Sequence, residues 1–170
     1  MVSDILTNRE MFHRATETAI RGELLGLDDE GLSWQLFYSV GLAPSAMLKA
    51  FAHRCAVDKI QYPHEPTPDA LCTWFGEKVV GRYKNGGEKV FEVTNRELFN
   101  RFVISVLETL RNANEKILIN TMLNPATVAN VMFLDFLDAC DKVGHKYPVF
   151  INDENLHKWL NERKMIVEED

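Results

Sequence analysis

The chain has 170 residues, of which 46% are hydrophobic and 26% charged, and its formal net charge is −6. This composition excludes a chain that is disordered throughout, and the length fits one domain with a sizeable core. The acidic balance argues against a protein that coats nucleic acid over its whole surface, although a local basic patch stays possible. We predict one globular domain over 1–170, with a disordered tail over 166–170.

The cysteines and the start of the chain bear on its compartment. Cys55, Cys72 and Cys140 include no pair at Cys-x-x-Cys spacing, and the chain opens on polar sequence at 1–4. Both features are typical of a cytoplasmic protein with free thiols. The longest uncharged run, 31–48, contains three serines and a proline. It is shorter than the roughly 20 apolar residues that span a bilayer, so we expect no membrane segment.

Helix-start signals occur along the whole chain. Thr7-Asn8-Arg9-Glu10 and Thr94-Asn95-Arg96-Glu97 each have the pattern of a capping box. Thr67-Pro68 and Asn124-Pro125 each suggest a cap before a proline at the first helical position, and Ser33 and Asn152 are further candidate caps. With the apolar spacing, these signals predict helices near 8–25, 34–40, 45–58, 68–76, 95–122, 125–143 and 153–164, the fifth with a break around 112–114.

One stretch has a strand pattern. The stretches 78–84 and 88–93, which contain valines and aromatic residues, flank Asn85-Gly86-Gly87, where Asn-Gly supplies the positive φ angles of a tight turn. We predict a β-hairpin near 78–94, with 149–151 as a candidate third strand. The expected fold class is mainly α, with a minor sheet on a helical body. We see no internal repeat, and the proline-rich loop at 62–68 is the one plausible internal boundary.

The segment 34–57 lies in a stretch, 31–57, that contains no acidic residue. Its residues Val40-Gly41-Leu42, Ser45, Met47, Lys49 and Phe51 resemble the helix-turn-helix of AraC-type regulators. The resemblance implies two helices joined at a glycine turn, the second of which meets DNA with its outer face. Phe37 departs from the pattern, which has a small residue there. The residues implied to bind DNA are Ser45, Lys49, His53 and Arg54, with Arg82 and Lys84 of the hairpin as a basic wing.

A buried pair of antiparallel helices explains the same segment, because buried surfaces seldom hold unpaired acids. This second interpretation places Leu36, Phe37, Met47, Leu48 and Phe51 inside the fold. It competes with the DNA-binding interpretation for the same residues.

Other polar groups have the residue types of metal sites but not the spacing. His53, Cys55, His64 and Cys72 lack the close pairs of a zinc finger. Two Glu-x-x-His pairs, at 10–13 and 154–157, have the form of di-iron ligands, but Glu10 and Glu154 also suit helix starts. Asp135, Asp138 and Asp141 follow one helical ridge, as a solvated stripe does. We expect no metal, no cofactor and no catalytic residue.

These structural explanations leave no motif that assigns a reaction. The sequence therefore favours a non-enzymatic binding or regulatory protein that acts through a protein partner of unknown identity. The alternatives are a helix-turn-helix DNA-binding regulator that uses residues 34–57, with nucleic acid as its partner, and a metal-dependent enzyme.

Overall fold

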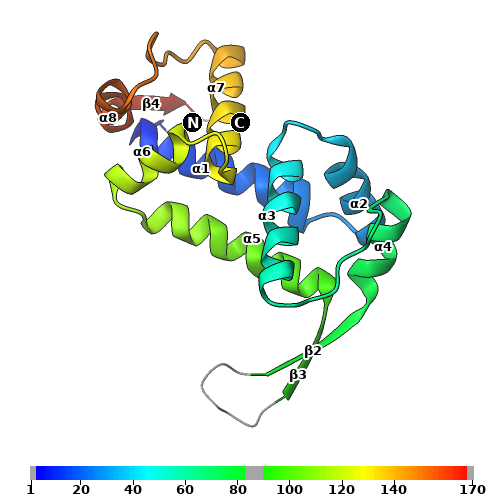
Figure 1. Ribbon diagram of the computed structural model, residues 1–170. Coiled ribbons are helices and arrows are strands. Elements are labelled where there is room, and N and C mark those ends of the chain that lie inside the picture. The colour runs from blue at the N-terminus through cyan, green and yellow to red at the C-terminus, as the bar shows by residue number, and fades with distance from the viewer. Residues whose placement is uncertain (1–2, 83–89, 168–170) are drawn as a thin grey trace. The chain divides into compact units, whose positions relative to one another are not determined.

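The computed structural model describes residues 3–82 and 90–167 (Figure 1). These residues form a mainly helical fold with eight α-helices and short antiparallel strand pairs, which confirms the predicted fold class. The predicted hairpin is present as β2 (Lys78–Arg82) and β3 (Val90–Thr94), with Lys78 opposite Thr94. Its turn at Asn85-Gly86 lies outside the described residues.

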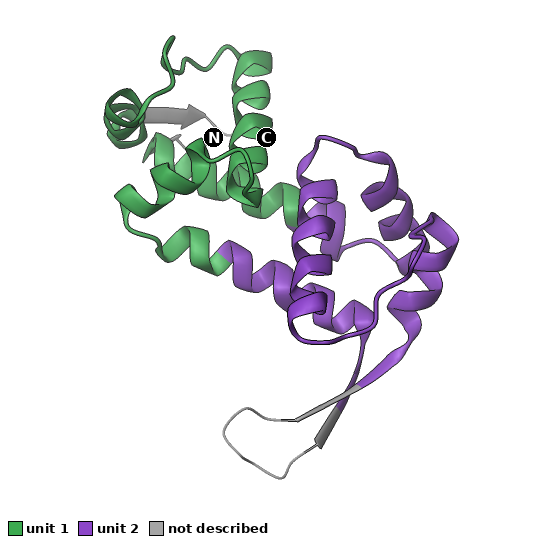
Figure 2. Cartoon of the chain, in the orientation of Figure 1, with its two compact units in different colours: residues 1–20, 108–170 green, residues 21–107 purple. Residues whose placement is uncertain are grey.

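Contacts within the chain gather in two compact units (Figure 2). Unit 1 consists of residues 1–20 and 108–170, and unit 2 of residues 21–107. The units therefore separate near Ile20 and Leu107, and not at the loop 62–68, which the sequence offered as the one plausible internal boundary. The prediction of a single domain over 1–170 stays a prediction.

Unit 2 begins with a π-helix, η1 (Arg21–Leu25), and continues through α2 (Asp29–Tyr38), α3 (Ala43–Val57) and α4 (Pro68–Gly76) to the hairpin. It ends with the first part of α5 (Asn95–Asn112). Thr67 caps α4 as predicted, because its side chain accepts a hydrogen bond from Ala70 N at 3.1 Å. The cap of α2 is Asp28 rather than Ser33, which lies inside the helix and donates to Asp29 O.

Unit 1 combines the two ends of the described chain. It contains β1 (Ser3–Thr7), α1 (Asn8–Ile20), the end of α5, α6 (Glu115–Leu123), α7 (Val128–Val143), α8 (Asp153–Asn161) and β4 (Arg163–Val167). β1 pairs with β4 in antiparallel register, with Thr7 opposite Arg163. Residues 166 and 167 of the predicted tail thus belong to a strand, and 168–170 lie outside the described residues.

Three local predictions fall within unit 1. The break near 112–114 is confirmed, because Asn114 caps a new helix by accepting from Ile117 N at 2.9 Å. The cap at Asn124 is wrong, since Thr127 caps α7 and accepts from Asn130 N at 3.1 Å. The third strand at 149–151 is also wrong: this stretch is a loop whose Val149 is 92% exposed.

The two units have the same internal architecture. In each, a short helix, a long helix and another short helix lead to a strand (α2, α3, α4 and β2; α6, α7, α8 and β4). This strand pairs with one that runs directly into a further helix (β3 into α5; β1 into α1). The registers also agree, because Thr7 faces Arg163 as Thr94 faces Lys78. No internal repeat was inferred from the sequence, whereas this order of elements occurs in both units.

Among the described residues, no single helix is long and apolar enough to cross a membrane. The pair α6 and α7 passes that test together, by length and composition only, across a bend of 84°.

Candidate docking surface

Three of the residues predicted to read DNA follow one side of α3 at i, i+4 and i+8, but the first of them, Ser45, is buried. Ser45 is only 7% exposed and lies one turn before the buried Leu48, so its predicted place on the outer face is wrong. Lys49, His53 and Arg54 are exposed, and Arg54 Nε pairs with Asp58 Oδ2 at 3.1 Å. Arg82 ends β2, and Lys84 lies outside the described residues.

The candidate metal ligands do not come together. In the described stretches 3–82 and 90–167, no three His, Cys, Asp or Glu side chains gather as a metal site would require. Burial raises the pKa of the Cys55 thiol to about 11, and that of Cys140 to about 11 as well. Both thiols therefore stay protonated at neutral pH and pack as small apolar side chains.

The Glu-x-x-His pairs have separate structural roles. Glu10 accepts hydrogen bonds from Thr7 as the acid of a capping box. His157 Nδ1 lies 2.8 Å from Glu115 Oε1 on another helix, α6. His13 Nε2 accepts a hydrogen bond from Arg9 Nε at 3.3 Å. Neither pair faces a common ligand position.

His13 makes the stability of the protein depend on pH. Burial, assisted by the charges of Arg9 and Arg111, lowers its pKa from 6.5 to about 4. Between these values the unfolded chain binds the proton and the folded chain does not, so the free energy of unfolding falls as pH drops from about 6.5 to 4. Asn100 holds the equivalent position in α5 and accepts from Arg96 Nε at 3.1 Å. We expect urea denaturation of His13→Asn to show a smaller loss of stability over this interval, and an unchanged loss would contradict this role of His13.

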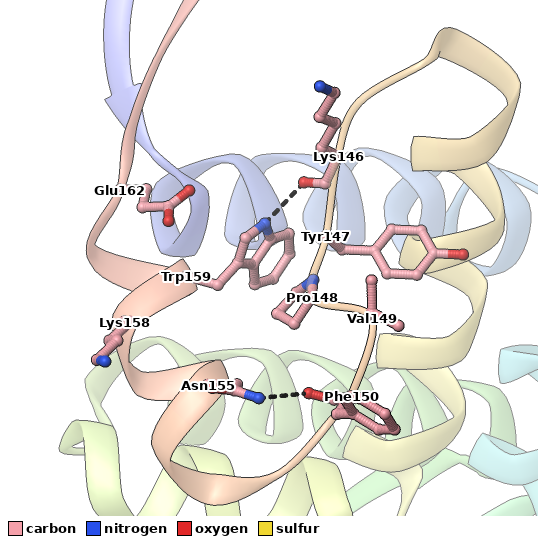
Figure 3. A pocket seen from close by; sticks show the side chains of 9 residues that line it. All are labelled: Lys146, Tyr147, Pro148, Val149, Phe150, Asn155, Lys158, Trp159 and Glu162. Atoms are coloured by element: carbon pink, nitrogen blue, oxygen red, sulfur yellow. Dashed lines mark hydrogen bonds between the residues drawn. The ribbon is translucent and has the colours of Figure 1, made fainter.

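A cleft of about 440 Å³ opens in unit 1 between the loop 146–150 and α8 (Figure 3). Trp159 Nε1 donates to Lys146 O at 2.8 Å, and Asn155 Nδ2 donates to Phe150 O at 3.0 Å, so two hydrogen bonds hold the loop to the helix. The cleft is lined by Tyr147, Pro148 and Trp159 together with the side chains of Lys158 and Glu162. Its two hydrogen bonds have a structural role, because they hold the loop against the helix.

A smaller cleft of about 310 Å³ lies in unit 2 beside α3 and α5. Phe51, Cys55 and Phe102 contribute apolar surface to it, while Arg54 and Asp58 bring charges that pair with each other. The charges of Arg54 and Asp58 are therefore largely satisfied by each other, and Arg101 is a further charged residue of the lining.

The most unusual surface is on α2. The rings of Trp34 and Tyr38 are stacked with centroids 4.4 Å apart, and the ring of Phe37 meets Tyr38 edge-on at 4.9 Å. The exposed fractions are 53% for Trp34, 39% for Phe37 and 59% for Tyr38. Val40 and Leu42 in the following turn are 78% and 48% exposed. We call these five residues the α2 patch.

The equivalent surface of unit 1 is mostly polar. The caps Asp28 and Asn114 align α2 with α6, so that Trp34 corresponds to Asn120 and Phe37 to Leu123, while Tyr38 corresponds to Asn124, the C-cap of α6. Both helices nevertheless keep the same buried side, with Leu32 and Leu36 in one and Leu118 and Met122 in the other. The fold therefore does not require aromatic residues on the outer side of this helix.

Sequence reasoning assigned Phe37 to the interior, and this was wrong, although Leu36, Met47, Leu48 and Phe51 are buried as predicted. One signal could have revealed the patch. Trp34, Phe37 and Tyr38 repeat at helical spacing on the side opposite Leu32 and Leu36, so α2 is apolar on two sides. A short helix at the surface of a small domain can bury only one of them.

Comparisons with known proteins found no matching family model, no matching curated protein and no matching solved structure.

Proposed function

We propose that the chain is a non-enzymatic binding or regulatory protein, and that it binds a protein partner through the α2 patch. The observation that carries this proposal is the contiguous group of exposed aromatic rings on α2, where Trp34 and Tyr38 align with Asn120 of α6 and with its C-cap, Asn124. Exposed apolar clusters that the fold does not need are typical of interaction surfaces. Tyr and Trp are also the residues that most often dominate the free energy of binding.

The surroundings of the patch indicate the chemistry of the partner. The patch lies within the acid-free stretch 31–57, and the following helix, α3, carries the exposed cation of Lys49. A partner segment that covers the rings of Trp34 and Tyr38 with apolar side chains, and carries carboxylates beside them, fits this surface. Burying aromatic side chains supplies affinity, while the charges favour the correct orientation.

The partner can be identified from the patch itself. A photo-crosslinking amino acid is placed at Tyr38 in one protein and at Asn124, its counterpart, in a control. We expect position 38 to crosslink a specific protein that position 124 does not. The purified partner is then titrated against Trp34→Asn and Tyr38→Asn, which install the residues of the equivalent helix.

Each of these substitutions is expected to raise the Kd at least about 30-fold, as loss of a central aromatic contact does. The melting temperature should change little, because both side chains are half exposed, and α6 has an asparagine at position 120 and another as its C-cap, at position 124. Asn120→Ala serves as the matched control on unit 1. If the Kd of all three variants equals that of the wild type, the α2 patch is not the binding surface.

One observation favours the DNA-binding alternative. α2, the turn with Gly41 at φ 85° and α3 have the order of a helix-turn-helix, and Lys49 and His53 are exposed on α3. Under this alternative, the crosslinker at position 38 or 53 labels nucleic acid rather than protein. Nothing in the described residues favours the metal-dependent enzyme.

A further inference from the structure

We propose that the two units are copies of one module, and that each copy carries the same receptor surface for a strand–helix segment with the sequence Thr-Asn-Arg-Glu-x-Phe. Unit 2 contains its segment, from β3 into α5, within its own continuous stretch. Unit 1 receives the corresponding segment, β1 and α1, from the start of the chain. This inference goes beyond the proposed function, because it defines a second recognition surface that occurs twice.

A buried asparagine makes the same contacts in both units. Asn8 N donates to Glu162 O at 2.9 Å, and its Nδ2 donates to Trp159 O at 2.6 Å. Asn95 N donates to Glu77 O at 2.9 Å, and its Nδ2 donates to Trp74 O at 2.7 Å. In each unit the asparagine thus joins the start of the segment's helix to the end of the receptor's last helix.

The tryptophan that accepts this bond is also held in the same way. Trp159 Nε1 donates to Lys146 O at 2.8 Å, and Trp74 Nε1 donates to Gln61 O at 2.7 Å. The loops that provide these carbonyls continue with Tyr147-Pro148 in one unit and Tyr62-Pro63 in the other.

The aromatic cores repeat the same geometry. Phe12 of the segment meets Phe136 edge-on at 5.4 Å and 77°, and Phe99 meets Phe51 at 5.2 Å and 78°. Phe136 lies 5.9 Å from Trp159 at 53°, while Phe51 lies 5.7 Å from Trp74 at 53°. Each segment phenylalanine is fully buried.

In both units the arginine of the motif donates to carbonyls at the end of the helical segment that leads into the receptor's first helix. The Arg9 guanidinium donates to Arg111 O and Ala113 O, and that of Arg96 donates to Leu24 O and Leu27 O. These carbonyls lie at the ends of α5 and η1, where the last carbonyls of a helix lack partners within it. The Thr and Glu of the motif form a capping box in both places.

The long helices α3 and α7 also end alike. Lys59 and Gly144 follow them with φ 59° and 72°, and the next residue donates to the carbonyl of Cys55 or Cys140, at 2.8 Å in each case. Lys59 is the only non-glycine residue with positive φ in the described chain. It adopts the same left-handed backbone conformation as Gly144, although this conformation is favourable mainly for glycine.

A shared fold alone does not explain these agreements. Unrelated helical proteins can share element order, but they do not place identical Asn, Arg, Trp, Phe and Cys side chains at matching contacts. Buried positions elsewhere agree as well: Met47 corresponds to Met132, and Leu71 to Leu156. Because the agreement is concentrated where the segment meets the receptor, the two segments are interchangeable.

The interchange is tested in the full-length chain. Residues 3–14 are replaced, one for one, by the sequence of residues 90–101. This puts Val93, which is buried in its own unit, at the buried position 6, and Glu92, which is exposed, at the exposed position 5. The control replaces residues 3–14 by the sequence of 89–100. The composition is nearly the same, but the buried Asn and Phe are displaced by one position, which turns them away from the receptor.

We expect the matched exchange to melt within about 5 °C of the wild type, and the shifted control to lose well over 10 °C or its cooperative transition. A reciprocal chain, with 90–101 replaced by the sequence of 3–14, should also stay folded. If the matched and shifted chains are equally destabilised, or equally stable, the receptor surface does not recognise this motif and the proposal is overturned.

Discussion

Replacing Phe51 by alanine is expected to lower the free energy of unfolding by about 3–5 kcal/mol, the usual cost of truncating a buried phenylalanine. Phe51 is 3% exposed, and its ring contacts those of Phe99 and Trp74. It therefore lies where α3, α4 and α5 meet inside unit 2. A domain has a total stability of only about 5–15 kcal/mol, so this loss should lower the melting temperature by many degrees.

The repeated architecture provides two controls. Phe136→Ala removes the equivalent ring of unit 1, which is 6% exposed, and should cost a similar amount. Phe37→Ala removes a side chain that is 39% exposed and should cost far less. Thermal unfolding followed by circular dichroism gives all three values. A melting temperature for Phe51→Ala within error of the wild type would show that this ring does not hold unit 2 together.

The helices could be predicted from the sequence because their signals are local. A cap at Thr67 before Pro68, or a capping box at 7–10, depends only on neighbouring residues, and the structure confirms both. The Asn-Gly signal likewise located the hairpin strands. Helix starts were less certain where several small polar residues stood close together, as at Asn124 and Thr127.

The pairing of β1 with β4 could not be derived in the same way. It joins residues from opposite ends of the chain, and the residues at 163–167 do not indicate which strand they pair with. The candidate third strand was instead placed at 149–151, packed beside the hairpin. The receptor for the motif at 7–10 was missed for the same reason, since Asn8 and Trp159 are brought together only by the fold.

The repeat escaped detection because most surface positions differ between the copies, and the loops differ in length around 26–27 and 39–42. These differences are informative once the copies are aligned. Residues that agree, such as Trp74 and Trp159, maintain the module, whereas the change from Trp34 to Asn120 alters its surface. A duplicated chain offers each surface twice, and because it has one α2 patch, the proposed partner should bind with one copy per chain.

The buried asparagines differ in one respect that predicts unequal energies. His145 Nε2 lies 2.7 Å from Asn8 Oδ1 and donates to it, because Asn8 Nδ2 already donates to Trp159 O. Ile60 takes the place of His145 in unit 2 and has no donor in its side chain. Asn95 Oδ1 is accordingly a buried oxygen without a hydrogen-bond partner among the described residues.

Asn8→Ala is therefore expected to destabilise the protein by about 2–3 kcal/mol, because it removes two side-chain hydrogen bonds, one to Trp159 O and one from His145 Nε2. Asn95→Ala should cost only about 1 kcal/mol, since it removes one bond but also an oxygen that was already unpaired. Ile60→His offers that oxygen a donor and should raise the stability by about 1 kcal/mol in the wild type, and not in the Asn95→Ala background. Urea denaturation of Asn8→Ala, Asn95→Ala, Ile60→His and the Ile60→His/Asn95→Ala double variant measures these four changes in stability. Equal losses for Asn8→Ala and Asn95→Ala, with no gain from Ile60→His, would show that the unpaired oxygen has no energetic consequence.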